Sequence, residues 1–300
     1  MNKVCADLQE NHGRKIAASY VQNVADWVGG IACAKEEHWE YATPSLDSAV
    51  KTVAISLDGA YIPLKEDGYR EAMVGTLSLY NHETERLHTI YLGAAPEYGK
   101  STFTQRMNTE IKRVKALYPE ALYIGIADGA ADNWTFLKNH TDQLLLDYFH
   151  ASEYLHHLAQ AAYPGKTDKP KREAWLTERR SQLKHEPGFV QTLIGEAQQL
   201  VKKKSLGKTV RENLNKALTY FTNQCKRMDY AGFLADQLPI GSGVTEAACK
   251  VLVKQRLCGS GMRWKEKGAR VVLSLRALSE STGRWGQFWD KINQFGAAPC

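Results

Sequence analysis

The order of the apolar segments along the chain constrains its fold more than any other feature of the sequence. Five runs have the length and apolar content of β-strands, and they lie at residues 52–57, 72–80, 86–92, 121–127 and 144–146. Segments with helical spacing follow the third, fourth and fifth runs, at 103–117, 134–137 and 149–162. Three strands in succession, followed by alternating helices and strands, are typical of a mixed sheet flanked by helices. We therefore predict an α/β fold around a mixed five-stranded sheet.

Helical patterns without strand signals occupy the rest of the chain. Residues 1–44 form an N-terminal helical segment, and the residues spaced to make its apolar face are Ile16, Tyr20, Val24, Trp27 and Val28. Residues 164–236 are highly charged and helix-like, which predicts a helical insertion. The sheet domain would then comprise residues 45–163 and 237–300. Three further helices are expected at its end, at 244–257, 266–279 and 285–295.

The basic residues are concentrated in two parts of the C-terminal half. The chain has 39 Lys and Arg against 33 Asp and Glu, for a net charge of +6. Residues 165–214 contain 12 basic and 6 acidic side chains, and residues 250–276 contain 8 basic side chains and one acid. Clustered basic residues favour a phosphate-bearing partner, because each neutralised phosphate releases counterions. Basic helices also serve as solvated surfaces, so the charge by itself leaves both interpretations open.

Several classes of protein are excluded by what the sequence lacks. No apolar run approaches the roughly 18 residues of a membrane helix, and the first residues contain no apolar signal-peptide core. The six cysteines form no CxxC pair and no zinc-finger spacing. We therefore expect a soluble cytoplasmic protein with reduced cysteines and no membrane partner.

Two of the apolar strands run into the same Asp-Gly pair. Asp58 follows VAISL and Asp128 follows YIGIA. Ligands of open α/β sheets collect at the carboxyl ends of strands, and a strand fixes the carboxylate that it delivers there. Asp-Gly is also a common turn, so one such pair would carry little weight. Two pairs on comparable strands favour a site.

A third acid stands at the start of a C-terminal helix. Gly-Ser-Gly precedes an apolar periodic segment, which places Glu246 in the first helical turn and Lys250 on the same side. Such a glutamate can simply complement the helix dipole. The basic residues that follow it favour a site instead, in which a carboxylate binds metal and lysines meet phosphate.

Three carboxylates on separate elements suit a pair of divalent metal ions, Mg²⁺ or Mn²⁺. Mg²⁺ prefers oxygen ligands and is typically held by one or two carboxylates with substrate phosphates, and two ions can stabilise both oxygens of an in-line displacement at phosphorus. The sequence lacks a nucleophile elbow, a P-loop, a dinucleotide fingerprint and an H-E-x-x-H motif. A glycosidase would line its cleft with aromatic residues and would not need the basic segments.

Four phrases in a fixed order carry a resemblance to a known family. They are SLDGAYIP, IADGAADNW, LLLDYFHASEYLHHLAQAAYP and GSGVTEAACKVLVKQRLCGSGMRWKEKGARVVLSLRAL. The chain resembles bacterial insertion-sequence transposases of the ISKra group, which belong to the DDE superfamily. The resemblance implies a ribonuclease-H-like catalytic domain with a helical insertion before the last acidic helix. It also implies that Asp58, Asp128 and Glu246 are the catalytic acids and the metal ligands.

The implied activity is metal-dependent DNA cleavage followed by strand transfer. An activated water would cut a phosphodiester at the element end, and the freed 3′ hydroxyl would attack target DNA. We expect DNA contacts from one histidine in a family phrase and from the basic stretch after Glu246: His150, Lys250, Lys254, Arg256, Arg263, Trp264 and Lys265. His150 could contact the scissile phosphate, orient Asp128 or make a structural hydrogen bond, and Trp264 could stack on a base or pack in the protein.

Members of this group usually carry a longer N-terminal region that recognises element ends. This chain begins close to the expected catalytic domain, and residues 11–19 would be only the remnant of a helix-turn-helix. A truncated or domesticated copy that binds DNA without transposing is therefore the alternative function. A purely structural scaffold would not explain the basic segments. The family resemblance further implies a homodimer or larger assembly on DNA.

Overall fold

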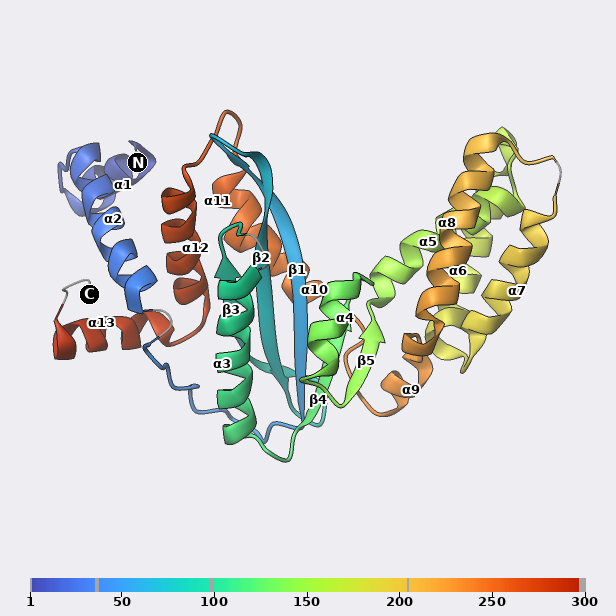
Figure 1. Cartoon of the computed structure of the whole chain (residues 1–300), viewed down its shortest axis with the longest axis horizontal. Coiled ribbons are helices and arrows are strands. Elements are labelled where there is room, and N and C mark those ends of the chain that lie inside the picture. Colours follow the sequence, from blue (N-terminus) through green and yellow to red (C-terminus); the bar gives the residue numbers. More distant parts are fainter. Residues whose placement is uncertain (1, 36–37, 98–99, 204, 297–300) are drawn as a thin grey trace.

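A mixed five-stranded sheet forms the centre of the molecule. The computed structural model describes residues 2–35, 38–97, 100–203 and 205–296. The strands are β1 (Thr52–Leu64), β2 (Gly68–Tyr80), β3 (Arg86–Ala94), β4 (Leu122–Ala127) and β5 (Gln143–Leu146). Their order in the sheet is β3-β2-β1-β4-β5, with antiparallel pairs β1–β2 and β2–β3 and parallel pairs β1–β4 and β4–β5. The predicted α/β class and mixed sheet are confirmed (Figure 1).

The first hairpin is longer than predicted. The sequence suggested that β1 ends at Asp58, whereas the strand continues to Leu64 and β2 begins at Gly68. Asp58 is paired with Val74 in the middle of this ladder. The extension is stabilised because Ala60, Ile62 and Leu64 alternate into a buried cluster beneath the C-terminal helices. The Asp-Gly pair is therefore part of a strand, and the hairpin turn lies further on.

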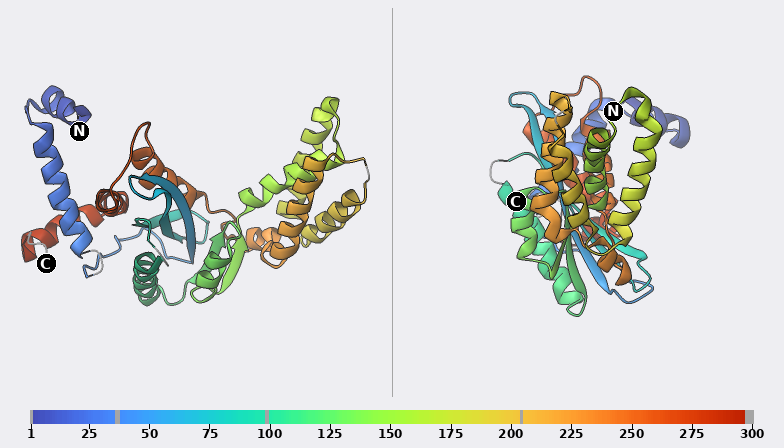
Figure 2. Two further views of the ribbon diagram at one scale, coloured as in Figure 1. Left: turned by 45° about the horizontal axis from the view of Figure 1, so that its top comes forward. Right: turned by 90° about the vertical axis from the view of Figure 1, so that its right-hand side faces the viewer.

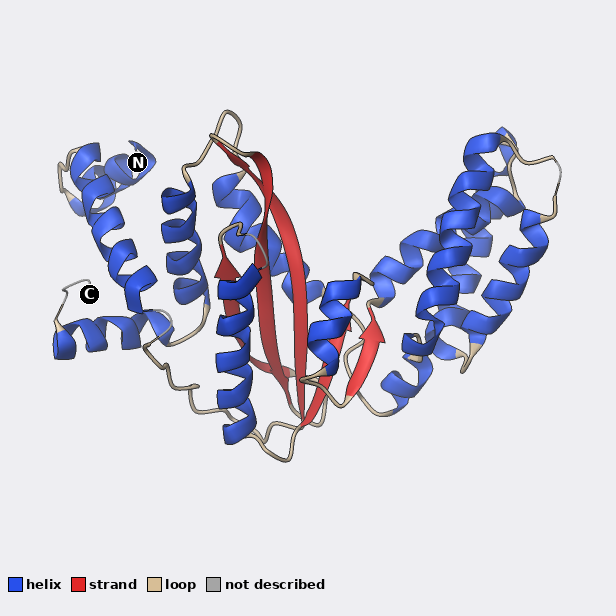
Figure 3. Cartoon of the chain, in the orientation of Figure 1, coloured by secondary structure: helices blue, strands red, loops and turns tan. Residues whose placement is uncertain are grey.

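Helices cover both faces of the sheet, and strand alternation explains which residues meet which helices. On one face, α3 (Ser101–Leu117) packs on β2 and β3, and α4 (Ala131–Lys138) packs on β4 and β5. On the other face lie α10 (Gly243–Ala248), the π-helical segment Cys249–Lys254, α11 (Gln255–Leu257) and α12 (Glu266–Glu280). Figure 3 shows these layers around the strands. The single helix predicted at 244–257 is thus three consecutive pieces, with a π turn of the kind often found at functional sites.

A helical bundle projects from the end of the sheet beyond β5 (Figures 1 and 2). It contains α5 (Tyr148–Ala162), α6 (Lys169–His185), α7 (Phe189–Val201), α8 (Lys208–Gln224) and α9 (Tyr230–Ala235), with short 3-10 turns at Lys166–Asp168 and Cys225–Arg227. The helical character predicted for 164–236 is present in the structure. α5, which precedes that segment, packs against α6, α7 and α8 and therefore belongs to the same bundle. The apolar core of the bundle is continuous with one face of the sheet.

The N-terminal segment folds into α1 (Asn2–His12) and α2 (Ala18–Lys35); α2 packs against α12 and near α13 (Arg284–Phe295), and α1 contacts α2. The predicted apolar face is largely wrong. Tyr20 is 61% exposed and Trp27 is 50% exposed, while Val28 is buried. The buried stripe lies further along α2, where Val28 and Ile31 pack with Phe288 of α13. The buried residues of α2 are Val28, Gly29, Ile31 and Ala32, so it is the C-terminal half of this helix that packs in the core.

Among the described residues, every helix is too short or too polar to serve as a membrane span. The five cysteines within the described residues form no disulfide bonds with one another, and Cys300 lies outside the described residues.

Candidate active site

An open groove between β1, the start of α5 and α10 brings together residues from distant parts of the sequence. The residues that line this acidic groove are Asp58, Gly59, His150, Glu246, Cys249, Lys250, Lys254 and Gln255. Five of them were predicted as site residues: Asp58, His150, Glu246, Lys250 and Lys254. The fold therefore joins a mid-strand acid, a helix-start histidine and an acidic helix in a single hollow.

Asp58 is held rigidly in the middle of β1. Its side chain shares a strand face with Ala60, which packs in the same cluster as Cys249. Its carboxylate accepts a hydrogen bond from the Gly59 N–H at 2.7 Å, and Cys249 lines the same groove. Burial and the negative charge of Asp58 raise the pKa of Cys249, so the thiol beside the carboxylate stays protonated. The strand and the Gly59 N–H together fix where this carboxylate points.

Glu246 faces the groove from the first turns of α10. Its side chain is 46% exposed, and its Oε1 lies 3.4 Å from Nε2 of His150. Burial raises the pKa of Glu246, the carboxylates of Asp147 and Asp58 raise it further, and His150 opposes them. Neighbouring carboxylates make each other's ionisation less favourable. A cation bound between them would therefore lower the energy of both charged groups.

Asp147 connects the two helices that supply His150 and Glu246. It is fully buried at the N-cap of α5, where Oδ1 accepts the His150 backbone N–H at 2.9 Å. Its Oδ2 accepts the Ser242 hydroxyl at 2.7 Å and also the Ser242 backbone N–H at the start of α10. Sequence reasoning assigned this residue no role. The available signal was an apolar strand ending in Asp, the same pattern that marked Asp58 and Asp128.

Asp128 stands directly after β4, on the strand next to Asp58. Ser56 is paired with Ile126, so the two acids occupy matching positions on parallel neighbours. Asp128 Oδ1 accepts the Ala130 N–H at 3.1 Å and the Asn133 amide at 3.5 Å. Asp128 is not among the residues that line the acidic groove. Within the described residues, no group of three or more His, Cys, Asp and Glu side chains is arranged to hold a metal ion.

The backbone of the Asp128 turn is held by α8 of the helical bundle. The Tyr220 hydroxyl donates to the carbonyl of Asp128 at 3.0 Å, and the Gln224 amide donates to the carbonyl of Gly129 at 3.1 Å. Burial raises the pKa of Tyr220 and nearby acids raise it further, so the phenol remains a donor. The bundle therefore contributes directly to the position of the second predicted acid.

The oxygen ligands of the acidic groove fit a hard divalent cation through two carboxylates. Asp58 and Glu246 offer oxygen ligands from two separately anchored elements, both partly accessible to water. His150 contacts Glu246 rather than Asp128, so it orients the third predicted acid and not the second. Its position in the groove leaves contact with a bound phosphate available.

The predicted basic contacts divide into two groups. Lys250 and Lys254 are exposed in the groove, and neither forms an ion pair with another residue in the described ranges. Arg263 and Lys265 are exposed on the loop between α11 and α12, outside the groove lining. The lysines in the groove are therefore the cations best placed to meet an anion bound by Asp58 and Glu246.

Trp264 packs within the protein. Its indole N–H donates to the carbonyl of Leu257 at 2.9 Å, and the Arg256 guanidinium lies 5.3 Å from its ring centre. Its backbone N–H donates to the Pro63 carbonyl, which ties the loop to the end of β1. Of the two roles expected for this tryptophan, packing is the one that these contacts support.

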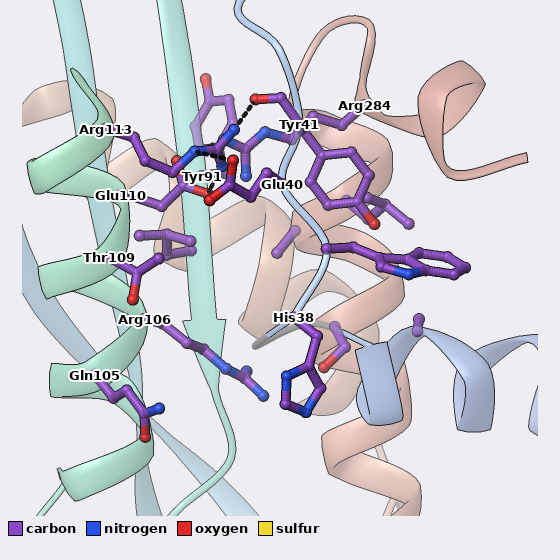
Figure 4. A pocket seen from close by; sticks show the side chains of 16 residues that line it. His38, Glu40, Tyr41, Tyr91, Gln105, Arg106, Thr109, Glu110, Arg113 and Arg284 are labelled. Carbon is purple, nitrogen blue, oxygen red and sulfur yellow. Dashed lines mark hydrogen bonds and ion pairs between the residues drawn. The ribbon is translucent and has the colours of Figure 1, made fainter. Parts of the chain in front are cut away.

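A second hollow lies between α3, β3, α12 and residues 38–41 (Figure 4). Its charged side chains are paired with each other. Glu110 accepts from Arg284 at 2.8 Å and lies 3.4 Å from Arg113, which also donates to the Tyr41 carbonyl. This ionic cavity ties the segment after α2 and the start of α13 to α3. Its pairing indicates a structural role.

A comparison with protein-family models found no match to this chain, and a comparison with curated proteins found none either. The acidic groove therefore has to be interpreted from its own chemistry.

Proposed function

We propose that the chain is a DDE-type DNA transposase that cleaves phosphodiesters and transfers strands at insertion-sequence ends. The observation that carries this proposal is the acidic groove itself. Asp58 and Glu246, far apart in the sequence, face one open hollow that Lys250 and Lys254 also line. Carboxylates for a cation beside lysines for phosphate are the groups that metal-dependent phosphodiester chemistry requires.

The architecture supports the same proposal. The element order and the mixed five-stranded sheet are compatible with a ribonuclease-H-like fold, which the resemblance to ISKra-group transposases implies. The helices of residues 164–236 precede the helix that carries Glu246, as that resemblance also implies. We accordingly assign residues 45–163 and 237–300 to the catalytic domain and 164–236 to an insertion.

Each residue of the groove has a defined task in this proposal. Bound Mg²⁺ or Mn²⁺, expected as two ions, would supply an activated water and charge stabilisation for in-line displacement. Asp58 and Glu246 would hold the cation, and Asp128 would join them from the adjoining strand. Lys250 and Lys254 would neutralise and orient the phosphate. DNA is the proposed partner, and a homodimer or larger assembly on DNA follows from the family resemblance.

The position of Asp128 favours a second candidate function. Because this acid lies outside the groove lining, the chain could be a copy that holds DNA without cutting it. Both candidates predict DNA binding that weakens as salt rises. Only the transposase function predicts that the chain also cleaves DNA.

The test is nicking of supercoiled plasmid in Mg²⁺ or Mn²⁺ by the parent protein and by Asp58→Asn and Glu246→Gln. We expect the parent to nick and each variant to lose about 100-fold or more in rate. Glu66→Gln, an exposed acid in the β1–β2 turn, is the matched control and should retain the parent rate. Equal nicking by all four proteins would contradict the assignment. Salt-sensitive binding without nicking by the parent would establish the second candidate.

A further inference from the structure

A second open groove runs along α8, on the other side of the Asp128 turn. Asn215, Thr219 and Asn223 follow one another at four-residue intervals and all line it. Each is exposed, and none forms a side-chain hydrogen bond with another residue in the described ranges. At 1.5 Å per residue, the row extends about 12 Å along the helix axis.

The chemistry of this row suits a hydrogen-bonding partner. Amide and hydroxyl side chains both donate and accept, so they can contact base edges, sugars and phosphates. Lys216 is exposed in the same groove and adds a positive charge. Glu212, also in the groove, would repel phosphate, so the neutral residues and Lys216 must supply the attraction.

The aromatic residues of this groove are occupied by each other. The rings of Tyr154 and Tyr220 stack at 3.8 Å with an angle of 7° between their planes. The Tyr220 hydroxyl is engaged by the Asp128 carbonyl. Binding of single-stranded nucleic acid relies on aromatic faces that bases can stack on. With these two rings stacked on each other, the observations favour a duplex.

The row is connected to the acidic site through one turn of chain. Gly129 lines the α8 groove, and the preceding Asp128 is the acid expected to join Asp58 and Glu246. Tyr220 and Gln224, on the adjacent face of the same helix, hold the carbonyls of this turn. A duplex on the outer face of α8 would therefore lie next to the acid whose backbone α8 fixes.

We propose that Asn215, Lys216, Thr219 and Asn223 form a duplex-DNA contact surface that extends the catalytic site onto the helical bundle. This inference rests on the proposed function, because it takes its partner from the DNA that the acidic groove would cut. The phosphate contacts of Lys250 and Lys254 depend on salt concentration. The surface on α8 would add hydrogen bonds that do not.

The test is the affinity of the full-length protein for a fluorescein-labelled duplex of mixed sequence, measured by anisotropy over a range of NaCl concentrations. The variant replaces three neutral side chains, Asn215→Ala, Thr219→Ala and Asn223→Ala. We expect roughly tenfold weaker binding with an unchanged salt slope, because no charge is lost. A matched control on α7 removes exposed polar groups of the same kind, Gln191→Ala, Thr192→Ala and Gln198→Ala, and should bind as the parent does.

Two charge variants sharpen the test. Lys216→Gln should weaken binding and reduce the salt slope by about one counterion. Glu212→Gln should strengthen binding, because it removes a carboxylate that faces the same groove.

The outcomes separate this inference from the proposed function. If the parent binds the duplex and the α8 triple variant binds equally well, the surface is wrong even when plasmid nicking is intact. If the triple variant loses affinity while the parent shows no metal-dependent nicking, the surface stands and the catalytic proposal fails. A parent that does not bind the duplex at all overturns the surface. Equal losses in the α7 control would also overturn it.

Discussion

The acidic groove and the ionic cavity contain similar side chains in opposite arrangements. In the ionic cavity, the buried Glu110 lies between Arg284 at 2.8 Å and Arg113 at 3.4 Å. In the acidic groove, two carboxylates share one hollow, and the lysines beside them have no ion-pair partner among the described residues. The charges of the ionic cavity are therefore neutralised by one another, whereas the charges of the acidic groove are available to a ligand.

This difference separates structural from functional charge within one fold. A buried pair with good geometry stabilises the native state relative to the broken pair, since removing one partner strands the other. Acids that crowd one another cost stability and favour a ligand that neutralises them. The two hollows should therefore respond in opposite directions when a charge is removed.

The largest expected effect is on the ionic cavity. Arg284→Ala leaves Glu110 buried without its closest cation, which should lower the free energy of unfolding by about 3–5 kcal/mol. The exposed pair Lys169–Glu173 is the control, and Lys169→Ala should cost less than about 1 kcal/mol. Urea denaturation measures both values. Equal losses would mean that the cavity has no special structural role.

A smaller effect is expected where the bundle holds the Asp128 turn. Tyr220→Phe removes the hydroxyl that donates to the Asp128 carbonyl and preserves the ring stack with Tyr154. Nicking of supercoiled plasmid should slow by about tenfold, the size of one lost hydrogen bond. Tyr154→Phe makes the same change on the stacked partner and should leave the rate near that of the parent. A normal rate in Tyr220→Phe would show that α8 does not position this acid.

The thiol beside Asp58 should have a measurable but lesser influence. Cys249→Ser keeps a polar group that can donate beside the Asp58 carboxylate, whereas Cys249→Ala removes it. We expect nicking to fall by about fivefold in the alanine variant and by less in the serine variant. Identical rates for the two variants would contradict a positioning role for the thiol.

The smallest effect has the opposite sign to the first. Burial and the neighbouring acids raise the pKa of Glu246 in the folded state, so its ionisation destabilises the fold. The raised pKa means that the folded protein retains this proton to higher pH than the unfolded chain does, and stability is lost as pH rises through that interval. Glu246→Gln should therefore be slightly more stable than the parent at pH 7, with no gain below about pH 4. Urea titrations at both pH values measure the free energy of unfolding. If Glu246→Gln were less stable than the parent at pH 7, the ionised Glu246 would not be destabilising the fold.

The sheet was predictable because its signals are local. Apolar runs bounded by polar turns identified all five strands, and the succession of strands before helices identified the mixed sheet. The end of β1 was missed because Asp58-Gly59 has the composition of a turn, while the strand is continued by the burial of Ile62 and Leu64 under a helix from the other end of the chain. That burial exists only after the tertiary contact has formed.

The site was predictable in part for the same reason. Asp58 and Glu246 could be selected from the ends of apolar segments, but the sequence could not show that they share a hollow or that Asp128 lies outside its lining. The contributions of Asp147 and Cys249 depend on contacts across the fold. The prediction of the apolar face of α2 was wrong for a similar reason. Helical spacing identifies a stripe of apolar residues, but it does not show which end of the stripe packs in the core.

The proposed chemistry depends on joint binding of a divalent cation by the acids of this groove. Binding of Mn²⁺, measured by electron paramagnetic resonance on the full-length protein, tests it without DNA and without turnover. We expect that the parent binds Mn²⁺ and that Asp58→Asn and Glu246→Gln each weaken binding at least about tenfold, while Glu66→Gln does not. Parent-like Mn²⁺ binding in both groove variants would contradict it.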